Sequence, residues 1–360
     1  MRWFIAISLL LALACSKKEA PPPAESEQAT ETEAETLPSA EGAGGTPAAG
    51  SERAEPAQEG TLPLPEELQG ETPALGAAPV LKVLEQGSEP RQALRWKVGS
   101  GFTQKLSADV DSTADALVSI VVARSPQYTV SYDLALHAKK VEKDGTVHVA
   151  FSVDEATPSA PTMDSNPKLA KRLKEALPAV RRVTGTYRMS PRGRVTDLQV
   201  KVPPNATPTC EEMIDSLRWA LTHWVPLFPE VPIGKDAEWT IHQAVEQNGV
   251  RVNQLRGYRV VKIDGNRVEL GMSTRQSATA QRFTSPGTAG PLDLAKLEGQ
   301  ATGSMTWNLT ELGPRTASFV MQVVRHATSV PAPGKESVPV TLNNTHSVKV
   351  GEPSSESDAP

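Results

Sequence analysis

The sequence predicts a mainly β (α+β) fold: antiparallel sheets from two related β-rich halves with a central amphipathic helix. Three observations support it: alternating segments, a pair of matching hairpin motifs and one clear helical pattern. Residues 128–136, 146–153 and 194–202 alternate apolar and polar side chains and are rich in Val, Thr and Tyr. Alternation with a period of two is typical of strands that bury one face.

Two hairpin motifs resemble each other. The first is VEKDGTVHVAF, with Asp144-Gly145 at its turn, and the second is VVKIDGNRVEL, with Asp264-Gly265. An Asp-Gly pair provides the positive φ angle that tight hairpin turns require. Each motif therefore predicts two antiparallel strands.

A second pair of segments follows the hairpins after about 40 residues: VTGTYRMSPRGRVTDLQV and ATGSMTWNLTELGPRTASFVMQV. Between hairpin and segment, each half has a Leu-rich stretch after a proline, PKLAKRLKEAL or PLDLAKLEG. The offset is 120 residues from Gly145 to Gly265 and 118 from Gly185 to Gly303. This agreement favours an ancestral duplication, with halves at about 77–205 and 232–350. The alternative is common hairpin chemistry that recurs in any β-rich chain.

The clearest helix is predicted over 209–225, in TCEEMIDSLRWALTHWVPLF. Thr209 followed by Glu212 is a capping-box pattern, and Pro226 ends the helix. Such a helix usually packs on a sheet; the alternative is a lid over an apolar cavity. Its apolar face carries Met213, Ile214, Leu217, Ala220, Leu221 and Trp224. The expected ligand-lining residues are Leu217, Leu221, Trp224 and Phe228.

The first 14 residues predict a lipoprotein signal peptide. Arg2 precedes an apolar run from Trp3 to Ala14, which is shorter than the ~20 residues of a membrane-spanning helix and suits a secretory signal. The segment LALAC resembles the lipobox of bacterial lipoproteins. That resemblance implies cleavage before Cys15 and acylation of its thiol and its new amino group. The alternative is an ordinary secretory signal that contains a cysteine.

Residues 15–76 predict a lipidated cysteine followed by a disordered acidic tether. The segment 16–76 is rich in Pro, Ala and Glu, and its 13 glutamates against three basic residues give a net charge of −10. Such a composition buries too little apolar surface to fold. About 60 residues of coil span roughly 45 Å. A second disordered segment is predicted at 351–360.

The folded part, 77–350, carries a net charge of about +7. The whole chain carries −5, of which residues 1–15 contribute +1, the segment 16–76 contributes −10 and the tail 351–360 contributes −3. This excess is compatible with an anionic envelope polymer or with lipid headgroups, or simply with ordinary surface residues. The sequence has no basic run with interleaved aromatic residues, so no nucleic-acid partner is expected. Oligomeric state does not follow from the sequence.

The sequence offers no catalytic constellation and no metal or cofactor motif. The six histidines are scattered without metal-ligand spacing. Cys210, expected at a helix N-terminus, has no histidine nearby in sequence and is interpreted as a structural thiol. We therefore expect neither an enzyme nor a bound cofactor.

The segment VLKVLEQGSEPRQALRWKVGSGFTQKLSADVD resembles the start of a family of bacterial, myxobacterial-type lipoproteins of unknown function. The resemblance continues through the two Thr-Gly strands, covers most of 80–350 and implies no activity. A fainter likeness, of architecture only, is to lipid-carrier lipoproteins built as a half-barrel sheet with a helical cover. The residues that carry the first resemblance are Gly87, Glu89, Pro90, Arg91, Leu94, Arg95 and Gly99.

These patterns together predict an envelope lipoprotein, anchored in a membrane through acylated Cys15, that binds an apolar ligand or lipid without catalysis. Ser16 after Cys15 favours the outer membrane, with the domain in the periplasm or at the cell surface. The alternative is an envelope scaffold or partner-binding module with a filled core.

Replacing Cys15 with Ala removes the thiol that would carry the acyl groups. The variant should be released from membranes and should not incorporate a fatty-acid analogue, as fractionation and metabolic labelling would measure. A Cys15→Ala protein that stays membrane-bound would contradict the lipid anchor.

Overall fold

A computed structural model describes residues 61–65, 73–118, 121–124, 128–159, 164, 166–247, 249–284, 290–330 and 336–352. The predicted signal peptide, Cys15, most of the predicted tether and residues 353–360 lie outside the described residues. The description below concerns the described part alone.

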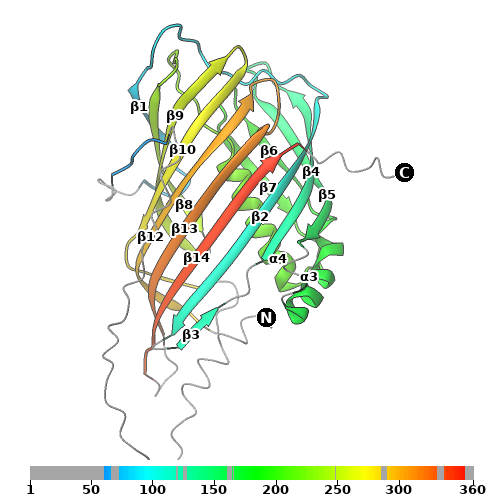
Figure 1. The fold of residues 1–360 in the computed structure, drawn as a ribbon, viewed down its shortest axis with the longest axis vertical. Helices are drawn as coiled ribbons and strands as arrows, with labels where there is room; N and C mark the ends of the chain where they lie inside the picture. The colour runs from blue at the N-terminus through cyan, green and yellow to red at the C-terminus, as the bar shows by residue number, and fades with distance from the viewer. Residues whose placement is uncertain are drawn as a thin grey trace, which may run out of the picture.

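The described residues form a β-rich fold with two helices (Figure 1). The helices are α3 (Pro167–Val180) and α4 (Pro208–His223). The strands are β1 (Val80–Glu85), β2 (Thr103–Val118), β3 (Val121–Arg124), β4 (Tyr128–Val141), β5 (Val147–Pro158), β6 (Thr184–Met189), β7 (Val195–Lys201), β8 (Glu238–Gln247), β9 (Val250–Asp264), β10 (Arg267–Ala278), β11 (Gln281–Phe283), β12 (Leu292–Asn308), β13 (Thr316–Ser329) and β14 (Pro339–Gly351).

The mainly β fold is confirmed, but the sheets predicted in the plural are one open antiparallel sheet of 14 strands. Its order is β1-β8-β9-β10-β12-β13-β14-β2-β4-β5-β6-β7, with β11 beside β12 and β3 beside β2. Strand twist accumulates across so many strands, and sheets of more than ~10 strands curl unless they flatten or split. Figure 1 shows this curvature, with the helices on the inner side of the sheet.

The two predicted halves occupy successive parts of the sheet. Strands β2, β4, β5, β6 and β7 follow one another as a meander, as do β8, β9, β10, β12, β13 and β14. The pairing of β14 with β2 joins the meanders. Both predicted Asp-Gly turns are present, with φ of 84° at Gly145 and 57° at Gly265. Each hairpin also has a register shift near its turn, at Lys139 and at Val261. The duplication itself stays a prediction.

The two matched Leu-rich stretches adopt different structures. PKLAKRLKEAL forms most of α3, whereas PLDLAKLEG forms the start of β12. In the first stretch Leu169, Leu173 and Leu177 recur every four residues and are buried, as on one face of a helix. In the second, buried Leu292 and Leu294 alternate with exposed Asp293. Among the described residues, the inner face of the second half therefore has no helix equivalent to α3.

Helix α4 confirms the predicted helix, but its N-terminus differs. Thr207, not Thr209, is the N-cap, and its side-chain oxygen accepts a hydrogen bond from the Cys210 amide at 3.2 Å. Pro208 occupies the first turn, where its missing N–H costs nothing. The predicted Thr209–Glu212 capping box is therefore wrong. The predicted apolar face is buried along its whole length.

Three buried side chains of the sheet hold α4 and the segment after it against the inner face. The Tyr132 hydroxyl on β4 donates to the Met213 carbonyl at 3.2 Å. The Trp307 indole on β12 donates to the Trp224 carbonyl at 3.1 Å, and the Trp239 indole on β8 donates to the Leu227 carbonyl at 3.0 Å. Because these strands belong to both meanders, α4 packs against both halves, and one core includes residues of both.

Residues 61–65, assigned to the tether by composition, pack on the outer face of the sheet. Leu62 is buried, and its carbonyl accepts a hydrogen bond from Ser273 on β10. A Cβ at Gly257 on β9 would lie 2.8 Å from a methyl group of Leu64 and 2.9 Å from one of Leu62, so this segment packs closely over the glycine. The segment 61–65 therefore packs on the sheet through its leucines, although its composition is that of the predicted tether.

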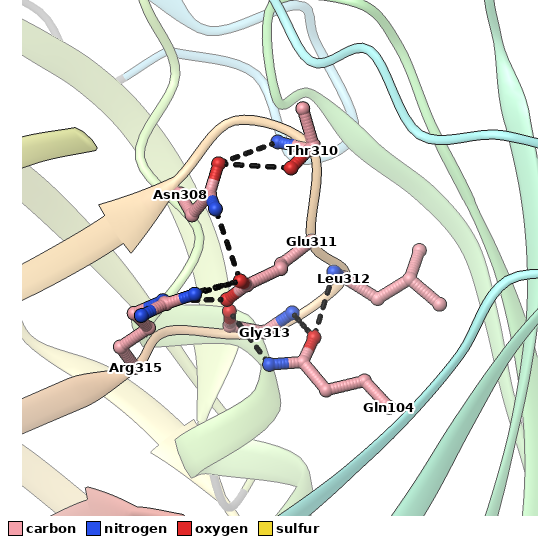
Figure 2. A network of polar contacts seen from close by, with 7 residues as sticks. All are labelled: Gln104, Asn308, Thr310, Glu311, Leu312, Gly313 and Arg315. Carbon is pink, nitrogen blue, oxygen red and sulfur yellow. Dashed lines mark hydrogen bonds and ion pairs between the residues drawn. The ribbon is translucent and has the colours of Figure 1, made fainter. Parts of the chain in front are cut away.

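The turn between β12 and β13 is fixed by a side chain from β2 (Figure 2). The Gln104 amide oxygen accepts from the backbone amides of Leu312 and Gly313, both at 2.8 Å. Within the turn, Asn308 donates to Glu311 at 3.0 Å, and Glu311 pairs with Arg315 at 2.7 Å. Gln104 therefore connects the two meanders away from the β14–β2 junction.

Replacing Gln104 with Ala would leave two backbone amides of the turn without their acceptor. We expect the free energy of unfolding to fall by about 1–3 kcal/mol, the range for partly buried groups that lose a hydrogen bond. Urea denaturation would measure this. The control is Gln300→Ala, an exposed glutamine of β12, for which a change within about 0.5 kcal/mol is expected. Equal losses in the two variants would contradict the role given to Gln104.

Candidate functional site

The four predicted lining residues lie together in the main core. Leu217, Leu221, Trp224 and Phe228 are each at most 4% exposed. The Phe228 ring lies 5.5 Å from Trp96 and 6.2 Å from Trp239, measured between ring centroids. Phe228 therefore packs among aromatic residues of the sheet and of the segment before it, and all four residues belong to the main core.

A second cluster of buried apolar side chains lies beyond the main core, on β9–β13. Since α3 and α4 contribute no buried member to it, the second half alone builds this cluster. We call it the second apolar cluster. Its members are Val250, Val252, Phe283, Leu292, Leu294, Leu297, Ala301, Met321, Val323 and Ala327.

Polar side chains lie between the main core and the second apolar cluster. On β9 the inner-facing residues run Val252, Gln254, Arg256 and Tyr258, so two polar residues occupy positions in the apolar phase. The cross-strand partners of Gln254 and Arg256 on β10 are Gln276 and Thr274. All four are buried. We call the following set the inner polar cluster: Trp219, His223, Gln254, Arg256, Thr274, Gln276, Arg325 and His346.

The C-terminal turn of α4 faces this cluster with Trp219 and His223. Trp219 packs against both apolar clusters, and its ring centroid lies 4.6 Å from that of His223 and 5.5 Å from that of His346. Arg256 donates to the Thr222 carbonyl at 3.4 Å. The end of the helix thus connects β9, which carries Arg256, with β14, which carries His346.

His223 is held in one neutral form. Its Nδ1 lies 2.7 Å from the Trp219 carbonyl, which can only accept, so Nδ1 carries the proton. Its Nε2 therefore accepts from the Gln254 amide at 3.3 Å. Burial and the nearby Arg256 guanidinium lower the pKa of His223 to about 3. The imidazole is uncharged at neutral pH.

On the other side of Trp219, Arg325 and His346 lie close together on β13 and β14. Burial lowers the pKa of Arg325 to about 10, so the guanidinium stays charged at pH 7. The Asn344 amide, oriented with its oxygen toward Arg325, accepts from Nη1 at 2.6 Å. Burial and the Arg325 charge lower the pKa of His346 to about 4. His346 keeps some exposed surface, and it too is neutral.

Several buried atoms of the inner polar cluster have no hydrogen-bond partner in the described part of the chain. They are Trp219 Nε1, Arg256 Nε, Thr274 Oγ1, Gln276 Nε2, Gln276 Oε1 and Arg325 Nε. A buried polar atom without a partner costs about 1–3 kcal/mol, and more when it is charged. Native proteins rarely leave such atoms unpaired, so a group of them needs an explanation, such as water or a ligand.

Sequence reasoning missed this cluster because it examined apolar periodicity and known motifs. A signal is present in the strands themselves. Arg256 falls in the phase of Val252 and Val260, and Arg325 falls in the phase of Met321 and Val323. A charged residue in the buried phase of a strand is unusual. Whether it is part of a site depends on which residues the neighbouring strands place beside it.

The sequence analysis also considered Cys210, metal ligands and a membrane-spanning segment. Cys210 is buried, and burial raises the pKa of its thiol to about 11, which opposes use as a nucleophile. In the described ranges, no group of three or more His, Cys, Asp or Glu side chains could hold a metal ion. Likewise, the described helices include none long and apolar enough to cross a membrane.

The GSEPR segment forms a turn against residues 233–237. Ser88 donates through its backbone to the Lys235 carbonyl at 2.8 Å, and Arg91 Nε donates to the Gly87 carbonyl at 2.9 Å. A Cβ at Gly87 would lie 2.3 Å from the Lys235 carbonyl oxygen. Arg95 donates to the carbonyls of Pro229 and Glu230. These contacts hold the GSEPR segment and Arg95 against residues 229–237, which precede β8.

Comparison with models of protein families and with curated proteins found no match to this chain.

The depressed pKa of His223 makes stability depend on pH. Between pH 6.5 and about 3 the unfolded chain binds a proton that the folded imidazole does not, so the free energy of unfolding falls as pH falls through this window. For a shift to about 3, His223 should account for about 2 kcal/mol of loss between pH 7.5 and pH 5. His223→Gln should lose about that much less than the wild type in urea titrations at the two pH values.

The control is His326→Gln, because His326 is exposed on β13. This variant should show the pH dependence of the wild type. If His223→Gln and the wild type lost equal stability between pH 7.5 and pH 5, the neutral buried state of His223 would be wrong.

Proposed function

We propose that this protein is a bacterial envelope lipoprotein whose β-rich domain binds an amphiphilic, largely apolar ligand without catalysis. The observation that carries the proposal is the inner polar cluster beside the second apolar cluster, with buried polar atoms that lack partners among the residues that the structure describes. A ligand with an apolar body and a few polar atoms would pack beside the second apolar cluster and satisfy those atoms.

The proposed site differs in place from the one expected from sequence. Leu217, Leu221, Trp224 and Phe228 support the site from the main core, and the ligand would contact the neighbouring side of α4, at Trp219 and His223. Trp219 suits this role because it is half-buried, touches both apolar clusters and has an unpaired indole N–H. An aromatic side chain with a free donor contacts the apolar and polar parts of one ligand.

The anchor and the tether belong to the same proposal. Acylated Cys15 would hold the protein in the envelope, preferentially in the outer membrane, and a tether of roughly 45 Å would let the domain reach beyond the bilayer surface. A binding protein with this reach could exchange lipid with a membrane.

A scaffold or partner-binding module is the second candidate. The observation that favours it is the main core, in which the predicted lining residues are almost fully buried and Phe228 packs against Trp96 and Trp239. A domain with a filled core and a basic surface could recognise an anionic envelope polymer instead of an internal ligand.

Two measurements on the full chain carrying Cys15→Ala test ligand binding. Mass spectrometry after organic extraction should detect a co-purified lipid, and the delipidated protein should bind a fluorescent long-chain fatty acid with saturation. Trp219→Leu should weaken this binding about tenfold, because the indole contributes both apolar contact and a hydrogen bond. The control Leu117→Ala alters an exposed leucine of β2 and should bind as the wild type does. Absence of both co-purified lipid and saturable binding would contradict the proposal and favour the scaffold.

A further inference from the structure

The unpaired atoms of the inner polar cluster are mostly donors. Trp219 Nε1, Arg256 Nε, Arg325 Nε and Gln276 Nε2 can only donate, and the Thr274 hydroxyl can donate as well. Among the atoms without a partner in this cluster, Gln276 Oε1 alone is a pure acceptor. A ligand that satisfies this set must therefore be rich in acceptors.

The two positive charges in the cluster also favour a ligand that is rich in acceptors. Arg256 and Arg325 are 8% and 4% exposed, and in the described part of the chain no carboxylate lies within ion-pair distance of either guanidinium. Their neighbours His223 and His346 are neutral and contribute no negative charge. Burying a charge without a counter-charge is costly, so proteins pair buried charges or assign them to a ligand.

The strand register places the two arginines on one face of the sheet, with β10 and β12 between them. Gln276 lies opposite Gly299 in the β10–β12 pair, and Gly299 lies opposite Val323 on β13, two residues from Arg325. A Cβ at Gly299 would lie 3.0 Å from Gln276 Oε1 and 3.3 Å from Val323, so Gln276 occupies the space that the glycine leaves. On the other side, Gln276 neighbours Gln254 and, through it, His223. Gln276 therefore lies between Gln254 and Val323 on the inner face, and Arg325 lies two residues beyond Val323 on β13.

We propose, building on the ligand-binding function above, that the ligand is an anionic amphiphile. Its acidic group, a carboxylate or a phosphate, lies against the donors of the inner polar cluster, with Arg256 or Arg325 as its counter-charge, and its acyl chain packs beside the second apolar cluster. The acidic oxygens accept from a guanidinium group and from neighbouring donors such as Trp219, and the neutral imidazoles border the acidic group without repelling it.

The test compares one acyl chain with and without a charge. The full chain carrying Cys15→Ala is delipidated and titrated with a fluorescent long-chain fatty acid and with its methyl ester. We expect the acid to bind at least about tenfold more tightly than the ester, the difference expected for hydrogen bonds to charged groups. A monoacyl phosphate of equal chain length should show the same advantage if phosphate is accepted; a carboxylate-only site would bind the acid alone.

Variants of the arginines locate the charge recognition. Arg256→Met and Arg325→Met keep the apolar length of the side chain, and the variant that removes the counter-charge should abolish the preference for the acid by weakening acid binding more than ester binding. Arg325→Lys should retain a preference for the acid. The control is Arg275→Met, because Arg275 lies on β10 between Thr274 and Gln276 but points to the opposite face of the sheet, where it contacts Gln300.

A second readout needs no ligand. Removing an unpaired buried charge should leave the unfolding midpoint of the delipidated Arg325→Met protein equal to or above that of the wild type. A lower midpoint would show that the Asn344 hydrogen bond and the packing of Arg325 outweigh the cost of its buried charge, and would overturn the proposal that the charge is kept for a ligand.

The outcomes separate the two proposals. Equal affinity for acid and ester in the wild type, or an acid preference that survives both methionine variants, would overturn the anionic ligand and leave ligand binding intact. Failure of acid and ester alike to bind would overturn the proposed function itself.

Discussion

The attachment of α4 to the inner face of the sheet is the interaction on which the rest of the structure depends. A curled sheet of 14 strands has a large apolar inner face that must be covered. Tyr132, Trp239 and Trp307 reach from strands of both meanders to carbonyls of α4 and of the segment after it. Each buried indole or hydroxyl gains its partner only when the helix is in place, so helix position and sheet curvature fix each other.

The same attachment leaves one region with different chemistry. Helix α3 covers part of the first half, but the matching Leu-rich stretch of the second half is the beginning of β12. The inner face of β9–β14 is therefore completed by the end of α4, through Trp219 and His223, and by polar side chains.

The polar groups at that boundary are costly to the protein alone. Two arginines are buried without a carboxylate partner in the described residues, and two histidines are held neutral beside them. Unpaired buried groups reduce stability, and such costs are usually retained at sites where they serve function. The cost of these groups supports the proposed recognition of an acidic amphiphile, whereas Leu217, Leu221, Trp224 and Phe228 are buried in the main core.

The sequence by itself determined the strand-rich class, both Asp-Gly hairpins and the buried face of α4, because these depend on residue periodicity and local turn chemistry. Only the tertiary structure decided that the strands form a single sheet, that Thr207 caps α4, and that PLDLAKLEG is a strand, because cross-strand pairing and packing override local similarity. The site shows the same division. Arg256 and Arg325 are 69 residues apart in the chain. A polar residue in the apolar phase of one strand indicates a site only when the sheet order shows which other polar residues share its face.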